Sequence, residues 1–147
     1  MKKVDRFYIP VPNPDHEMQA IRLGLAWLQD RVEVDNATEA VLATLTRWQI
    51  LNGTILARAL GEDIASRLHS RRPVSIGRAR LILLTERKMK WLRFPSPTPV
   101  LCVYTSMKQL DELDKATNVS AICLVLSPDF NQKWVDSWKP DRISALR

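Results

Sequence analysis

The chain is poor in the residues that build cofactor loops and disulfide frameworks. It contains four glycines and two cysteines among 147 residues. The glycine-rich motifs G-x-x-x-x-G-K-[ST] and G-x-G-x-x-G are missing, and so is the G-x-S-x-G elbow. Proteins that cradle a nucleotide phosphate or a catalytic serine at such turns need those glycines. The sequence therefore predicts no bound cofactor.

Long apolar runs are also missing. The longest, at residues 121–126, is too short to span a bilayer. Residues 1–10 lack the apolar centre of a signal peptide. Both cysteines, Cys102 and Cys123, lie inside apolar runs, which favours buried reduced thiols. These features predict a cytoplasmic protein without a membrane partner, and the length and ordinary composition predict one α/β domain over residues 1–147.

Residues with catalytic or metal-binding chemistry do not form a known pattern. His16 and His69 have no C-x-x-C or H-x-x-x-H companion, so the sequence predicts no metal site. His69 has serines nearby in the chain, but a Ser–His pair needs a fixed geometry that adjacency does not supply. A small phosphoryl- or nucleotide-handling enzyme, with its site at the carboxyl ends of the strands, is therefore only the weakest of three functional hypotheses.

Extended and helical segments alternate along the chain. Strands are predicted at residues 7–11, 40–45, 80–85, 99–105 and 119–127. The last two are near-continuous apolar runs, as in strands that are covered on both faces. For the second strand, a helix that begins near residue 36 is an alternative interpretation.

Capping patterns mark the helix starts between these strands. Asn13 precedes a proline and an apolar stripe at spacings of three and four, which predicts a helix. The boxes T-x-x-Q at Thr46 and S-x-x-Q at Ser106 predict two more. The helix after Thr46 runs to His69 or breaks at Gly61. A last helix follows a Ser-Pro-Asp start and carries large rings at a spacing of four: Phe130, Trp134 and Trp138.

This alternation predicts a three-layer Rossmann-like fold of about five mostly parallel strands with helices on both faces. The connection at residues 86–98 has room for only a turn or two of helix, near the minimum for a parallel crossover. An antiparallel pairing of the strand at residues 80–85 therefore stays open. Pro95, Pro97 and Pro99 are interpreted as connector positions.

The positive charge of the chain is concentrated in one segment. Residues 67–93 contain nine lysines and arginines and one acidic residue, whereas the rest of the chain contains 13 basic and 15 acidic residues. The net charge of +6 therefore arises in this segment. Such an asymmetry points to an anionic partner, although charge runs are often solvated surface and cations at a helix end complement its dipole.

Ligands of open parallel sheets bind at the carboxyl ends of the strands, beside helix N-termini. The residues expected there are the candidate anion site: Arg47, Thr85, Arg87, Lys88, Thr105 and Ser106. A secondary basic cluster is expected at a helix end and in the loop after it: Arg67, Arg71, Arg72 and Arg78. Because helix ends and strand ends face opposite ways, we expect two separate basic sites, with the ligand at the first.

The leading hypothesis is a non-enzymatic binding module that recognises an anionic group, such as nucleic acid, a nucleotide or a phosphorylated ligand, through residues 67–93. Trp91, between Lys90 and Arg93, has two interpretations: it stacks on a base, or, as is more common for such a tryptophan, it closes the edge of a core. The alternative hypothesis is a protein-interaction or assembly domain, such as a homodimer, that uses exposed aromatic surface at Trp48, Trp91 and Trp138.

Overall fold

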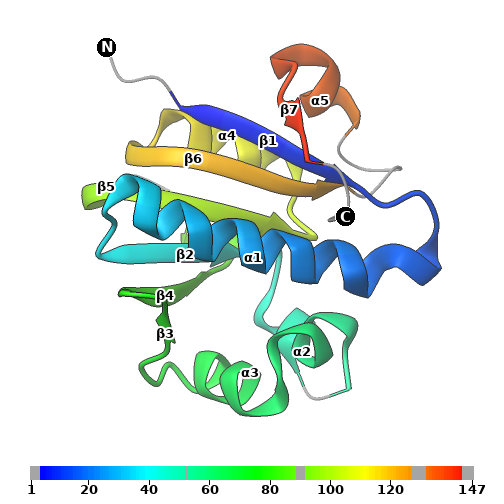
Figure 1. Cartoon of the computed structure of the whole chain (residues 1–147), viewed down its shortest axis with the longest axis vertical. Coiled ribbons are helices and arrows are strands. Elements are labelled where there is room, and N and C mark those ends of the chain that lie inside the picture. The colour runs from blue at the N-terminus through cyan, green and yellow to red at the C-terminus, as the bar shows by residue number, and fades with distance from the viewer. Residues whose placement is uncertain (1–3, 52, 89–91, 127–131, 144–147) are drawn as a thin grey trace.

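A computed structural model describes residues 4–51, 53–88, 92–126 and 132–143. These residues form a mostly parallel sheet with helices on both faces, which confirms the expected three-layer α/β architecture (Figure 1). The strands are β1 (Asp5–Pro10), β2 (Glu39–Ala43), β3 (Ser75–Ile76), β4 (Ala79–Leu84), β5 (Arg93–Val103), β6 (Thr117–Leu126) and β7 (Asp141–Arg142). The helices are α1 (Glu17–Asp35), α2 (Ile55–Leu60), α3 (Glu62–His69), α4 (Met107–Lys115) and α5 (Gln132–Trp138), with 3₁₀ turns η1 (Pro14–His16), η2 (Arg47–Ile50) and η3 (Glu86–Lys88).

Within the described residues, the strand order is β3-β4-β2-β5-β6-β1-β7. The five predicted strands all run parallel, and the two-residue strands β3 and β7 extend the sheet at its edges. Residues 39–43 form strand β2, so the helical alternative for this segment is wrong. β2 lies between β4 and β5 and pairs in parallel with both. The chain segment that connects β4 to β5 therefore crosses from one side of β2 to the other.

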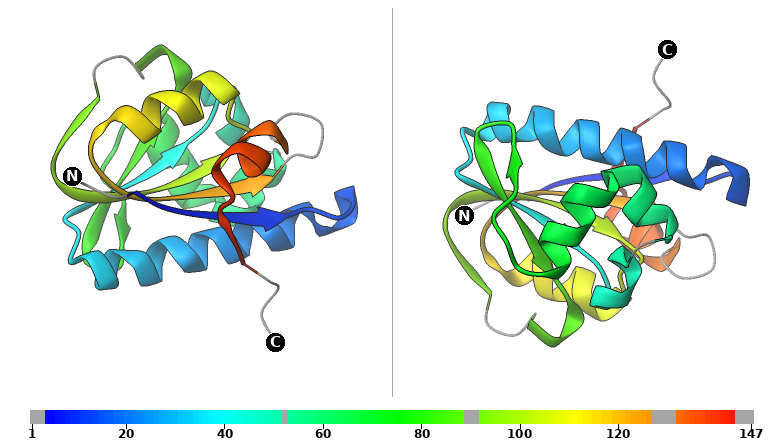
Figure 2. Two further views of the ribbon diagram at one scale, coloured as in Figure 1. Left: turned by 90° about the horizontal axis from the view of Figure 1, so that it is seen from above. Right: turned by 90° about the horizontal axis from the view of Figure 1, so that it is seen from below.

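The core has two halves, one on each face of the sheet. On one face, α1, α2 and α3 bury residues such as Ile21, Leu56 and Leu68 against the sheet. On the other face, α4 and α5 do the same with Leu110 and Trp134 (Figure 2). Successive side chains of a strand point to opposite faces of the sheet. The continuous apolar segments of β5 and β6 therefore supply side chains to both halves of the core.

The capping patterns at Asn13 and Ser106 begin helical segments where the sequence predicts them, whereas the predicted Ser-Pro-Asp start of the last helix lies outside the described residues. The side chain of Asn13 accepts a hydrogen bond from the backbone N–H of Asp15 at 3.0 Å, and η1 leads directly into α1. At α4, the Ser106 hydroxyl accepts from the Gln109 N–H at 3.2 Å, while the Gln109 carbonyl oxygen accepts from the Ser106 N–H at 2.9 Å. This reciprocal box satisfies two N–H groups that the first turn leaves without partners.

The segment after β2 differs from one continuous helix. The box at Thr46 begins only the 3₁₀ turn η2, and Thr54 caps a new helix by accepting from the Ala57 N–H at 3.1 Å. The chain then breaks at Gly61, whose φ of +94° suits glycine, and α3 restarts at Glu62. The segment therefore forms three short elements, η2, α2 and α3, and the predicted break at Gly61 is present.

The prolines before residue 100 lie inside strand β5, so their interpretation as connectors is wrong. β5 pairs with β6 at Arg93, at Thr98 and then regularly from Pro99, with one register shift between Arg93 and Thr98 and another between Thr98 and Pro99. It pairs with β2 only from Val100. Pro95 and Pro97 thus occupy a stretch where the ladder is interrupted, and the missing proline N–H costs no hydrogen bond there.

Helix α1 approaches the sheet closely at Gly24. A Cβ atom at this position would lie 2.7 Å from Leu101 Cδ1 and 3.3 Å from Val125 Cγ2. Leu101 is fully buried in the centre of the sheet. Gly24 has a low helix propensity, but its lack of a side chain allows α1 to pack closely against β5 and β6.

No described helix is both long enough and apolar enough to cross a bilayer.

We predict that Gly24→Val lowers the free energy of unfolding by about 3 kcal/mol, because the added methyl groups overpack a closed core. Urea denaturation measures this loss. Ala26→Val is the matched control, because Ala26 lies on the exposed side of the same helix, and it should cost only about 0.5 kcal/mol of helix propensity. Equal losses in the two variants would show that the close contact is unimportant.

The two cysteines provide a second test of the core. Both thiols are fully buried and unbonded to each other, and burial raises the pKa of each thiol well above its ordinary value. We predict that neither thiol reacts with a thiol reagent such as Ellman's reagent in the native protein, and that both react at once in denaturant, since the thiolate is the reactive form. Rapid reaction of a native thiol would contradict the packing of β5 or β6.

Candidate functional site: an arginine-lined pocket

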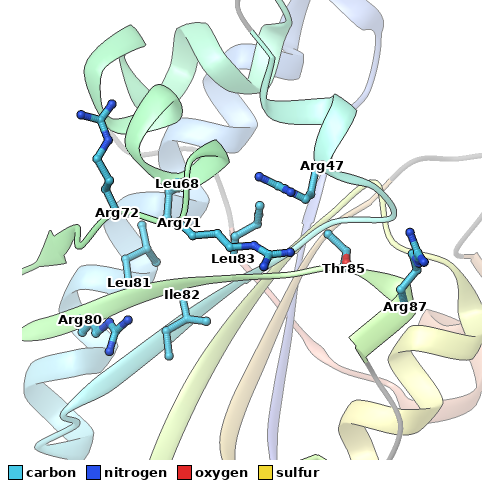
Figure 3. Close-up of a pocket in the computed structure, with 10 residues that line it drawn as sticks. All are labelled: Arg47, Leu68, Arg71, Arg72, Arg80, Leu81, Ile82, Leu83, Thr85 and Arg87. Atoms are coloured by element: carbon cyan, nitrogen blue, oxygen red, sulfur yellow. The ribbon is translucent and has the colours of Figure 1, made fainter.

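A pocket of about 580 Å³ lies along strand β4 (Figure 3). The residues that line it are Arg47, Leu68, Arg71, Arg72, Arg80, Leu81, Ile82, Leu83, Thr85 and Arg87. Half of these described residues are arginines, and none is acidic. The pocket therefore combines an apolar floor with a strongly positive rim.

The pocket exists because one side of β4 is left largely without a neighbouring strand. β3 pairs with β4 only at Ala79 and Arg80, and the Leu81 N–H donates to the Val74 carbonyl at 2.8 Å. Beyond Leu81, none of the described strands pairs with that side of β4. Side chains from both faces of the strand therefore reach the same opening, which explains why the four consecutive residues 80–83 contribute to it together with Thr85.

The backbone of β4 also contributes polar groups to this opening. The Arg80 N–H donates to the Thr38 carbonyl at 3.0 Å, and the Leu84 carbonyl accepts from the Thr44 N–H at 2.9 Å, so both residues bond toward β2. Backbone groups alternate in direction along a strand. The N–H of Leu83 therefore faces the open side, where it can donate to a bound anion.

Arg47 enters the pocket from the start of η2. It follows Thr46, whose N–H donates to the Gln49 side chain at 3.0 Å and so fixes the turn. The Arg47 Nε atom is buried and has no hydrogen-bond partner among the described residues. A buried donor without a partner is costly, and a ligand oxygen would satisfy it.

Arg71 and Arg72 enter from the end of α3. The Arg71 N–H donates to the Leu68 carbonyl at 3.1 Å, and the Arg72 N–H donates to the Arg67 carbonyl at 2.7 Å. These two bonds form the Schellman motif that ends many helices, and its left-handed position is usually glycine. Here Arg71 holds that position with a φ of +59°. An arginine therefore occupies a backbone position that glycine would occupy at lower cost.

Two arginines meet at the middle of the pocket and the others flank them. In Figure 3, Arg71 extends over Leu83 toward Thr85, and Arg47 extends toward it from η2. Arg80 lies at the beginning of β4, and Arg87 lies beyond its end, in η3. The positive rim is thus elongated along the strand and has its densest point above Leu83 and Thr85.

The pocket arginines lack the ionic partners that other arginines of the chain have. The Arg6 Nε atom lies 2.9 Å from the Asp114 carboxylate. The Arg31 guanidinium lies 2.6 Å from the Asp5 carboxylate and 3.1 Å from the Asp35 carboxylate. In contrast, no carboxylate of the described residues lies within 4.0 Å of any of the five pocket arginines. Their charges therefore repel one another without internal compensation.

The structure brings part of each predicted basic group into this pocket. Arg47, Thr85 and Arg87 of the candidate anion site line it together with Arg71 and Arg72 of the secondary cluster. This differs from the expected pair of separate sites. Arg71 turns back over the strand after the left-handed turn that ends α3, and so joins residues at the far end of β4.

The other predicted residues lie elsewhere. Thr105 is buried, and the Ser106 hydroxyl caps α4 and donates to Glu86 at 2.9 Å, so neither lines the pocket. Arg67 pairs with Asp63 at 3.4 Å on the surface of α3. Arg78 is exposed in the turn between β3 and β4. The side chain of Lys88 lies outside the described part of the chain.

Sequence reasoning missed Arg80. It was expected inside a strand, where side chains alternate between the faces of a sheet and no ligand is anticipated. Its signal is the charged residue in the otherwise apolar segment Ala79–Leu84, which indicates a strand with one open side.

The tryptophans of the alternative hypothesis differ in exposure. Trp48 is 73% exposed and follows Arg47 in η2. Trp138 is 43% exposed, and the Arg6 guanidinium lies 4.0 Å from its ring centroid. Trp91 lies outside the described residues. Trp48 is therefore the ring that lies open to solvent next to a pocket residue.

Metal chemistry finds no support in the described residues, which contain no group of three or more His, Cys, Asp or Glu side chains arranged to hold an ion. Comparison with protein-family models, curated proteins and solved structures finds no significant match to this chain. Function is therefore inferred from the chemistry of the pocket.

The left-handed turn at Arg71 generates a stability prediction. We expect Arg71→Gly to leave the free energy of unfolding unchanged or to raise it by up to about 1 kcal/mol, because glycine relieves the strained φ. Arg72→Gly is the matched control: it removes the same charge from the same pocket, but Arg72 does not have a positive φ. It should cost about 0.5–1 kcal/mol. Urea denaturation that finds equal losses would refute the strain at Arg71.

Proposed function

We propose that this protein is a binding module for a phosphate-bearing anion, which it holds in the arginine-lined pocket along β4. The observation that carries the proposal is the set of five arginines that line one pocket without a carboxylate partner among the described residues. Such a cluster is electrostatically unfavourable by itself. An anion that binds there removes the repulsion and adds charge-assisted hydrogen bonds.

The anion sits between Arg47 and Arg71, above Thr85. Both arginine side chains extend over the pocket, Arg47 from η2 and Arg71 across Leu83, and arginine matches the oxygens of a phosphate with two parallel N–H donors. The unpartnered Arg47 Nε and the outward N–H of Leu83 supply two further donors. Together these groups offer more donors than a carboxylate can accept, which favours phosphate.

Binding rather than catalysis is proposed because the pocket lacks a general base. None of its described lining residues is Asp, Glu, His, Lys or Cys. Arginine stays protonated at all ordinary pH values, so it positions and neutralises a ligand but does not accept a proton. A threonine hydroxyl without a neighbouring base is a weak nucleophile.

The proposal predicts that inorganic pyrophosphate raises the melting temperature of the wild-type protein, because a ligand of the native state alone stabilises that state. Arg47→Gln and Arg71→Gly should each weaken the affinity about tenfold or more, as expected for a charged hydrogen bond worth about 1.5–3 kcal/mol. Isothermal titration calorimetry measures the affinity, and differential scanning fluorimetry measures the shift.

Arg78→Gln is the control variant. It removes the same charge from the same basic segment, but Arg78 is exposed and does not line the pocket. Its affinity should stay within about twofold of wild type, since a screened surface charge contributes little. Chloride at matched ionic strength controls for salt. If pyrophosphate gives no shift in wild type, or the same shift in all four proteins, the proposed function is wrong.

A further inference from the structure

We infer that the ligand of this pocket is a single strand of nucleic acid, whose backbone follows β4 and whose exposed bases contact the apolar floor and Trp48. The inference rests on the proposed function and specifies its ligand class. Three observations carry it: the length of the positive rim, its charge, and the partly exposed apolar floor together with the exposed Trp48 that follows Arg47 in η2.

The rim is longer than one phosphate group. Arg80 and Thr85 are five residues apart along an extended strand, which corresponds to roughly 17 Å at about 3.3 Å per residue. Arg87 lies beyond that end. The central pair, Arg47 and Arg71, suffices for one phosphate. The flanking arginines at both ends of β4 have anionic partners only if the ligand extends along the strand.

The charge of the rim also exceeds that of one phosphate group. Five arginines line the pocket, whereas a phosphate monoester carries a charge of about −1.5 to −2 at neutral pH. A chain of phosphodiesters supplies one negative charge per nucleotide at regular spacing. At a rise of about 3.4 Å or more per nucleotide, the rim accommodates up to about five nucleotides.

The floor of the pocket favours a single strand over a duplex. Ile82 and Leu83, both partly exposed, lie among the arginines, and apolar side chains gain nothing from a phosphate backbone. The base faces of a duplex are hidden in its stack, whereas an unpaired strand exposes them. Trp48, 73% exposed and adjacent to Arg47, is a ring on which an unpaired base stacks.

The open edge of β4 also admits an extended acidic peptide as an added strand. The single strand is the better fit because an acidic peptide gives the exposed Trp48 ring no flat partner. The experiment includes this peptide as an arm that overturns the inference.

Fluorescence anisotropy tests the inference with labelled oligomers of about twelve nucleotides, a length within the usual range for single-strand binding proteins. The probes are oligo-dT and oligo-U, and the competitors are a blunt duplex, pyrophosphate and an oligoglutamate peptide. Either oligomer should bind, and the duplex and the peptide should compete weakly. The logarithm of the affinity should fall with the logarithm of salt concentration with a slope of about −0.7 per phosphate contacted.

Variants at the two ends separate this inference from the proposed function. Arg80→Gln and Arg87→Gln should each weaken oligomer binding about fivefold or more and reduce the salt slope by about 0.7. Their effect on pyrophosphate affinity should be clearly smaller than the roughly tenfold loss expected for Arg47→Gln and Arg71→Gly, because a single pyrophosphate lies at the central pair. Trp48→Ala should weaken oligomer binding about fivefold or more without altering the salt slope, because stacking is not ionic. Arg78→Gln should match wild type in every assay.

The outcomes are distinct. Pyrophosphate binding that depends on Arg47 and Arg71, without oligomer binding, overturns this inference and leaves the proposed function in place. Tighter binding of the duplex or of the oligoglutamate peptide also overturns it. Oligomer binding that Arg80→Gln, Arg87→Gln and Trp48→Ala leave unchanged shows that the strand binds elsewhere, which overturns it as well. If neither pyrophosphate nor an oligomer binds, both proposals fail.

Discussion

Parallel strands need cover on both faces, and this requirement organises the whole molecule. β5 lies at the centre of the sheet, and Val100, Leu101 and Cys102 have no exposed surface. The long helix α1 provides one side of this cover because Gly24 lets its backbone approach Leu101 and Val125. With the centre covered by α1 and α4, the shorter α2 and α3 pack farther out on the first face (Figure 1). The centre of the sheet is therefore closed, and the arginine-lined pocket lies toward its margin, along β4.

The arginine-lined pocket lies near the edge of the sheet that β3 and β4 form. β3 is too short to pair along all of β4, so the strand keeps an open side over its second half. Proteins commonly protect such edges with charged residues, which discourage pairing with another chain. Here Arg80 lies on the strand itself, while Arg71 and Arg87 come from the segments before and after it. One set of charges thus lies along the edge and lines the pocket.

The arginines of the described residues differ in their ionic partners. Arg6 and Arg31 bind carboxylates that hold elements together: Arg6 contacts Asp114 of α4 and the ring of Trp138 in α5, and burial raises the pKa of that carboxyl. Breaking a pair of this kind leaves a partly buried charge behind. The pocket arginines lack such internal partners among the described residues, and Arg71 accepts a strained backbone besides. Such costs are typical of positions kept for a ligand.

The sequence by itself determined the alternation of strands and helices, the capping boxes and the concentration of positive charge in residues 67–93, because each depends on residues that are neighbours in the chain. It also indicated Arg47, Thr85 and Arg87 as strand-end residues, since strand ends follow from periodicity. Only the tertiary structure decided that Arg71, Arg72 and Arg80 share a pocket with them. That depends on the left-handed turn after α3 and on the short pairing of β3 with β4, which arise from packing between distant segments. The role of Gly24 was also decided only by the tertiary structure. Its helix propensity marks it as a weak point of α1, whereas in the fold it allows close contact with Leu101 of β5.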